Sequence, residues 1–153
     1  MCAQLKNNNK TFVHRDFHVS NIMIHKKKLY IIDSQDALFG NIAYDLASLI
    51  DDVRLETTKN FKKKVYDKYF SLNKKKINKK NFKSDFIILS ILRNFKIIGI
   101  FKRLHKRDKK QKYLKLIPHA WKLIEDRLIE KKNLKELKIN IDKYFPKKVR
   151  YKI

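Results

Sequence analysis

The sequence predicts an α+β fold that is mostly helical, in which a short β-hairpin precedes a helical body. Two observations lead to this prediction. Between residues 11 and 40, β-branched and aromatic residues come in short runs that are typical of strands. After residue 42, apolar residues recur every three or four positions, which is typical of amphipathic helices. A length of 153 residues fits a single domain.

The β part begins with a short lead-in strand at residues 11–13. The apolar runs at 22–24 and 29–32 predict two strands joined by a lysine-rich turn. Residues 14–21 and 33–41 are polar, so we expect both to be loops. Because the hairpin lies between these loops, it brings them to the same end of the β element.

The remainder reads as helices separated by charged connections. Asn41 is expected to cap the first helix, since asparagine side chains accept hydrogen bonds from free backbone N–H groups there. The third helix is apolar on most sides, which predicts that it is buried. Pro146 is expected to follow the last one. The expected helices are residues 42–52, 58–72, 84–105, 113–130 and 134–144.

The charge balance is strongly basic, with 39 Lys and Arg against 15 Asp and Glu, a formal net charge of +24. A charge of this size is typical of polyanion-binding proteins. However, 32 of the 39 are lysines spread along the chain, and bidentate base readout favours arginine. Lys, Asn and Ile share A/T-rich codons, so biased base composition is a sufficient explanation. We therefore expect no specific nucleic-acid partner.

Cysteine content and hydropathy argue against secreted and membrane classes. Cys2 is the single cysteine, so an internal disulfide is excluded and a reducing compartment is favoured. The first ten residues hold no apolar signal region. The longest apolar stretch, 86–101, is interrupted by Arg93, Asn94 and Lys96, whereas a membrane span needs about 20 mostly apolar residues. We expect a cytoplasmic protein with no membrane partner.

The residues that indicate chemistry lie in the two loops. His14-Arg15-Asp16 is followed by Asn21, five residues after the aspartate, and Asp33 comes twelve residues later. Two carboxylates and a carboxamide gathered in this way suit Mg²⁺ bound together with substrate phosphates. The other aspartate can accept the proton of a substrate hydroxyl, as phosphoryl transfer requires. This is the kinase pattern of H-R-D-x4-N followed by a metal-binding aspartate.

The residues after Asp33 separate this chain from the protein kinases. Protein kinases continue with Phe-Gly and a long activation segment that ends in Ala-Pro-Glu. Here Ser34-Gln35-Asp36 follows, and a helix is predicted to begin near residue 42. This layout resembles the aminoglycoside phosphotransferase-like small-molecule kinases. Segments 14–18, 33–37, 44–46 and 93–104 further resemble the bacterial N-acetylmuramate/N-acetylglucosamine kinases of that superfamily.

The resemblance implies a role for each matching residue. Asp16 would be the catalytic base, and Asn21 and Asp33 would hold Mg²⁺, with ATP as co-substrate. Asp45 would buttress the catalytic loop, although an acidic residue at a helix start is an equally good interpretation. Ser34 departs from the family, which usually has an aromatic residue there. The remaining candidates are His14 and Arg15 as supporting residues and His18, Asp36 and Arg103 as possible substrate contacts.

The resemblance also implies a domain organisation. Residues 12–145 would form a kinase-like C-terminal lobe, with catalytic loop 14–21, metal loop 33–36 and helical subdomain 42–145. Residues 1–11 would be a frayed segment and residues 146–153 a tail. A glycine-rich phosphate loop is excluded because Gly40 and Gly99 are the only glycines. We therefore expect the N-terminal lobe to be absent, and a separately encoded partner is one way in which it could be supplied.

Three functions stay open at this stage. The first is the phosphotransferase lobe of an ATP-dependent kinase for an N-acetylated amino sugar in cell-wall recycling, with little or no activity alone. The second is a degenerate remnant without catalysis. The third is a basic module that binds RNA or another polyanion, which predicts steeply salt-dependent binding.

Overall fold

The computed structural model describes residues 2–7, 10–73 and 77–152, and the chain forms two compact units divided between Leu89 and Ser90. The first unit holds two strand pairs and the helices α1 (Tyr44–Ile50) and α2 (Lys59–Asn73).

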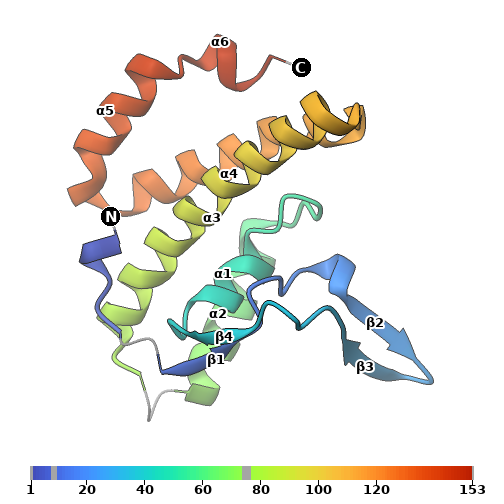
Figure 1. Ribbon diagram of the computed structural model, residues 1–153. Helices are drawn as coiled ribbons and strands as arrows, with labels where there is room; N and C mark the ends of the chain where they lie inside the picture. The colour runs from blue at the N-terminus through green and yellow to red at the C-terminus, as the bar shows by residue number, and fades with distance from the viewer. Residues whose placement is uncertain (1, 8–9, 74–76, 153) are drawn as a thin grey trace. The chain divides into compact units, whose positions relative to one another are not determined.

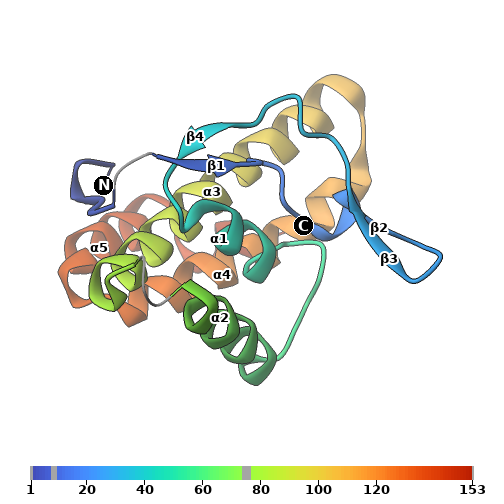
Figure 2. The same ribbon diagram turned by 90° about the horizontal axis from the view of Figure 1, so that it is seen from below.

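The four strands of the first unit form two separate antiparallel pairs. β1 (Thr11–Val13) pairs with β4 (Leu38–Gly40), with Phe12 opposite Phe39. β2 (Ile22–His25) pairs with β3 (Lys28–Ile31) as a tight hairpin, which stands apart from the other pair (Figures 1 and 2). Gly40 lies close to β1, because a Cβ there would make a tight contact of 3.1 Å with Cγ2 of Val13.

Aromatic packing joins the helices of the first unit. Tyr69 on α2 stacks on Phe82, with ring centroids 5.7 Å apart. Tyr66 meets Phe86 edge to face at 5.1 Å. Both phenylalanines belong to α3 (Lys79–Asp108), the helix whose N-terminal part lies in this unit. These contacts fix α2 against the start of α3.

The second unit is helical. It contains the rest of α3 together with α4 (Ile117–Glu130), α5 (Lys135–Tyr144) and α6 (Lys147–Arg150). Trp121 on α4 lies at its centre, with Phe95 and Phe145 rings at 5.7 and 5.4 Å. Among the described residues, no helix is both long enough and apolar enough to cross a membrane.

The mostly helical α+β prediction is confirmed, and the hairpin and helices lie close to their expected positions. Helix α3 is longer than expected, since it begins at Lys79 and ends at Asp108. The stretch expected as one helix from residue 113 is instead a 3₁₀ helix, Gln111–Leu116, followed by α4, which has Pro118 in its first turn.

Two local predictions between residues 33 and 43 were wrong. The expected loop 33–41 ends in strand β4, whose partner β1 lies about 25 residues earlier in the chain. Asn41 is not the N-cap of α1, because that position belongs to Ala43. Asn41 lies two residues before that N-cap, and its Oδ1 accepts a hydrogen bond from the backbone N–H of Ala43 at 3.0 Å.

Both ends of the chain also carry more structure than expected. Near the N-terminus, Cys2–Gln4 is a 3₁₀ helix, and the backbone N–H groups of Lys6 and Asn7 each donate to the Asp85 carboxylate at 2.8 Å. In the expected tail, residues 147–150 form α6, and Arg150 is buried. A buried charged side chain holds each segment, Asp85 near the N-terminus and Arg150 near the C-terminus. The spacing of apolar residues in the sequence does not reveal such contacts.

Candidate functional site

Loop 14–21 leaves β1 and enters β2 through a 3₁₀ helix, Val19–Asn21. His18 N–H donates to the carbonyl of Asp16 at 3.0 Å, and Asn21 N–H donates to the carbonyl of His18 at 2.9 Å. Arg15 has a φ of 71°, in the left-handed region that ordinary residues rarely adopt. The loop is therefore a compact turn fixed by its own backbone bonds.

The carboxamide of Asn21 is the centre of the candidate site. Its Nδ2 donates to the backbone carbonyl of Asp16 at 3.0 Å and to Oδ2 of Asp33 at 3.4 Å. The backbone carbonyl of Asn21 accepts from Ile32 N–H at 3.1 Å, which ties the two loops together. The structure thus brings the backbone of Asp16 and the carboxylate of Asp33 to the Asn21 carboxamide. Asp33 also lies in the left-handed region, at a φ of 70°.

The donor set fits a hard divalent cation. Because Nδ2 of Asn21 is occupied as a donor, the group left for a cation is its oxygen Oδ1, beside the exposed carboxylate of Asp33. Mg²⁺ takes oxygen ligands and usually only one or two protein carboxylates. Within residues 2–7, 10–73 and 77–152, no three His, Cys, Asp or Glu side chains gather as metal ligands. A magnesium site here would consist of Asn21 and Asp33.

His14 lies behind the site rather than in it. Its ring is buried, and Nε2 lies 3.0 Å from the carbonyl oxygen of Ile32. Since a carbonyl only accepts, Nε2 carries the proton in this contact. The ring also meets Phe17 edge to face at 6.1 Å. This geometry holds the loop against the end of the hairpin.

Asp45, in the first turn of α1, binds the start of the loop. Its Oδ2 accepts from His14 N–H at 2.7 Å, and its Oδ1 accepts from Arg15 N–H at 3.1 Å. Of the two interpretations of Asp45, these contacts match the buttress. Burial raises the pKa of Tyr69, and the negative charge of Asp45 raises it further.

The remaining predicted site residues, Arg15, Asp36, His18 and Arg103, differ in their surroundings. Arg15 Nη1 donates to the backbone carbonyl of Asp36 at 3.3 Å, whereas the Asp36 side chain is exposed. His18 is buried. Arg103 belongs to the second unit and stays a prediction. One contact at the site was not predicted from the sequence: Asp52 Oδ2 accepts a hydrogen bond from Val19 N–H at 3.1 Å. The two residues are 33 positions apart, so no local sequence pattern indicates this bond.

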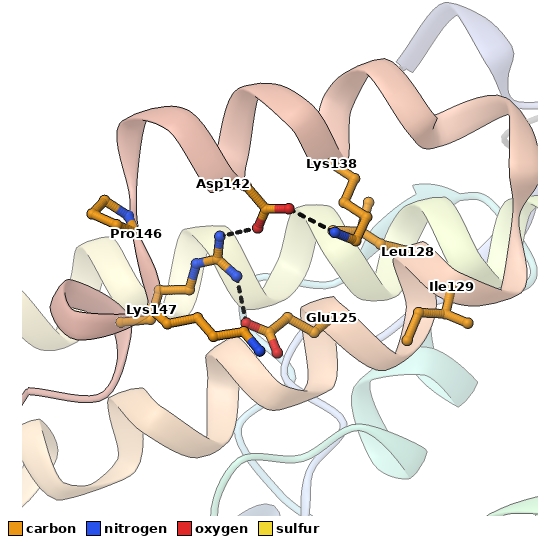
Figure 3. A pocket seen from close by; sticks show the side chains of 8 residues that line it. Glu125, Leu128, Ile129, Lys138, Asp142, Pro146 and Lys147 are labelled. Carbon is orange, nitrogen blue, oxygen red and sulfur yellow. Dashed lines mark hydrogen bonds and ion pairs between the residues drawn. The ribbon is translucent and has the colours of Figure 1, made fainter.

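A separate cavity of about 330 Å³ lies in the second unit between α4, α5 and α6 (Figure 3). Arg150 pairs there with Glu125 and Asp142, and Lys138 pairs with Asp142. The hydrogen bond from Arg150 holds the pKa of Asp142 below its usual value. Burial would lower the pKa of Arg150, but these acidic partners raise it. The cavity is thus lined by three basic side chains, Lys138, Lys147 and Arg150, and two acidic ones, Glu125 and Asp142.

Comparison with known proteins relates the site to a family. Residues 1–74 match the phosphotransferase enzyme family. The chain is 36% identical to the N-acetylmuramate/N-acetylglucosamine kinase of Neisseria meningitidis over 71% of its own length and 34% of that protein. It is 30% identical to the kinase of the same name from Caulobacter vibrioides, over 91% of the chain and 39% of that protein. The chain thus spans little more than a third of these relatives.

Proposed function

Since this chain resembles the phosphotransferase enzyme family through the segment that holds both loops, we propose that it carries the catalytic and metal loops of an ATP-dependent phosphotransferase. The observation that supports this most directly is that the Asn21 carboxamide donates both to the backbone carbonyl of Asp16 and to the carboxylate of Asp33. Phosphoryl transfer depends mainly on positioning and charge neutralisation, which these residue types supply.

In this proposal each residue has one task. Asp16 accepts the proton of the substrate hydroxyl and orients the oxygen for attack. Asn21 and Asp33 hold Mg²⁺, which when bound neutralises phosphate charge. His14, Arg15 and Asp45 keep the loop in shape through the bonds described above. His18, Asp36 and Arg103 are proposed as substrate contacts.

The proposed acceptor is an N-acetylated amino sugar, because the relatives that match most of this chain are named N-acetylmuramate/N-acetylglucosamine kinases. The net charge of +24 supports an anionic sugar such as N-acetylmuramate over a cationic aminoglycoside. Peptidoglycan recycling in the cytoplasm is the process we propose for it.

We propose further that a nucleotide-binding lobe must complete the enzyme, encoded separately or with this chain. Exposed apolar side chains on the strands support this, among them Phe12, Ile24, Leu29 and Phe39, which are 63–77% exposed. Each strand pair therefore exposes large apolar side chains, which are typical of an interaction site where they form a patch.

The test is a sugar-kinase assay on two proteins. The 153-residue chain alone is expected to give little or no N-acetylmuramate-dependent ATP turnover. A chimera, in which this chain replaces its matching segment in the Neisseria meningitidis relative, is expected to be active. Asp16→Asn should abolish that activity, and Asp67→Asn, which alters an exposed residue of α2 paired with Lys63, should not.

A folded chimera with no activity, or one that Asp16→Asn leaves active, would contradict the proposal. Robust turnover by the chain alone, lost in Asp16→Asn, would keep the phosphotransferase assignment and remove the need for a second lobe.

A further inference from the structure

Asp52, two residues beyond the end of α1, holds a position in the site that none of the roles above uses. Its Oδ2 accepts from the backbone N–H of Val19 at 3.1 Å. Its Oδ1 accepts from the backbone N–H of Arg54 at 3.1 Å and from Arg54 Nη1 at 3.2 Å. One carboxylate therefore joins loop 14–21 to an arginine after the helix.

This carboxylate is shielded from water. The side chain of Asp52 is 0% exposed, and that of its partner Arg54 is 27% exposed. A buried carboxylate is costly unless a cation and hydrogen bonds offset the lost hydration. Both oxygens of Asp52 accept hydrogen bonds, one from Val19 and the other from Arg54. Because an asparagine has a single side-chain oxygen, it could accept only one of these two sets of bonds.

Val19 begins the 3₁₀ turn that ends at Asn21. The hydrogen bond that Val19 N–H donates to Asp52 therefore fixes the turn at its first residue. This residue lies two positions before Asn21, whose carboxamide contacts Asp16 and Asp33. Asp45 fixes the other end of the loop at His14 and Arg15. One carboxylate from the first turn of α1 and one from the segment just after the helix thus hold an eight-residue loop at two places.

We propose that Asp52 is a positioning residue. Together with Asp45 at the start of α1, it clamps loop 14–21 and so presents Asn21 to the divalent cation. The metal-binding role of Asn21 rests on the proposed function, whereas the clamp itself rests on the hydrogen bonds of Asp45 and Asp52. Asp52 acts through Val19 and touches neither substrate nor metal. Replacing a side chain that orients a metal ligand in this way typically weakens metal affinity 10- to 100-fold.

The experiment compares Asp52→Ala and Asp52→Asn in the 153-residue chain, with Mn²⁺ alone as the probe. NMR measures the hydrogen-exchange rate of the Val19 amide and the Mn²⁺ broadening of the Asn21 and Asp33 signals. The matched control is Asp51→Ala, because Asp51 is equally buried and pairs with Lys62 of α2.

In Asp52→Ala, Val19 exchange is expected to accelerate roughly 10- to 100-fold, the effect of losing one bond to a charged acceptor. The Mn²⁺ dissociation constant should rise about tenfold or more. Asp52→Asn keeps one acceptor and should fall between Asp52→Ala and the unaltered chain, which also covers the case in which Asp52→Ala fails to fold. Asp51→Ala should leave both readouts close to those of the unaltered chain.

The proposal is overturned if the Asp52 variants change neither readout, or if Asp51→Ala changes both as strongly. A different failure would concern the metal site itself: no Mn²⁺ broadening at Asn21 and Asp33 in the unaltered chain contradicts the proposed function. Fast Val19 exchange in Asp52→Ala would in that case still support the clamp.

Discussion

At the scale of single residues, Asp45 performs two functions that can be separated by experiment. Its carboxylate accepts two backbone hydrogen bonds from loop 14–21, and its charge raises the pKa of Tyr69. Tyr69 itself donates to the backbone carbonyl of Ile42 at 3.2 Å, just before α1. The loop, the helix start and α2 therefore meet around this one side chain.

Asp45→Asn should lower the free energy of unfolding by about 2 kcal/mol, because one loop N–H loses a charged acceptor. The pKa of Tyr69 should fall but stay above its ordinary value of 10.0, since burial is the larger of its two causes. Chemical denaturation and NMR titration of the Tyr69 ring measure the two effects.

The control for this prediction is Asp67→Asn, which removes an exposed acidic residue of α2 in an i,i+4 pair with Lys63. Such pairs stabilise helices by about 0.2–0.5 kcal/mol. An equal loss of stability in both variants, or a Tyr69 pKa that Asp45→Asn does not lower, would contradict the assignment.

At the scale of elements, the hairpin turn between β2 and β3 is conformationally strained. Lys26 and Lys27 have φ angles of 46° and 61°, and His25 pairs directly with Lys28. Two-residue turns with two positive φ angles favour Asn-Gly, because side chains with a Cβ are disfavoured in the left-handed region.

The double substitution Lys26→Asn with Lys27→Gly should therefore stabilise the hairpin, by about 1 kcal/mol. Slower amide exchange at Met23 and Tyr30, whose N–H groups face each other across the hairpin, would report the gain. Lys28→Gln provides the comparison, since it removes a positive charge from a strand residue of the same hairpin. If Lys28→Gln gives the same gain, the effect comes from charge and not from backbone strain.

The elements also show which predictions a sequence supports. Helical periodicity located α2 and α5 closely, because that signal is local and repeated along each helix. Strand β4 was missed, because three residues that end in Gly40 become a strand only by pairing with β1. In the candidate site, the spacing of Asp16, Asn21 and Asp33 could be recognised, but the long-range bond from Asp52 could not.

At the scale of the whole molecule, the excess of 24 positive charges should reduce stability through self-repulsion. Raising NaCl from about 10 mM to about 150 mM shortens the Debye length from about 30 Å to about 8 Å. We expect a stabilisation of about 1 kcal/mol, which for a chain of this size raises Tm by about 2–4 °C. Differential scanning calorimetry measures the shift.

A variant with fewer charges tests the cause of that shift. Lys68, Lys83 and Lys96 are exposed, and their joint replacement by glutamine lowers the repulsion without touching the loops. The salt dependence of Tm should be smaller in this variant. A Tm that falls with salt in the unaltered chain would mean that attractive ion pairs outweigh the repulsion.

The left-handed backbone at Arg15 and Asp33 has a consequence for binding. Such conformations cost about 1–3 kcal/mol each and persist only where the surroundings enforce them. Hydrogen bonds to Asp45 and within the loops offset this cost when the chain folds. An incoming ligand is then spared the entropy loss of ordering a flexible loop, so more of its contact energy remains as affinity.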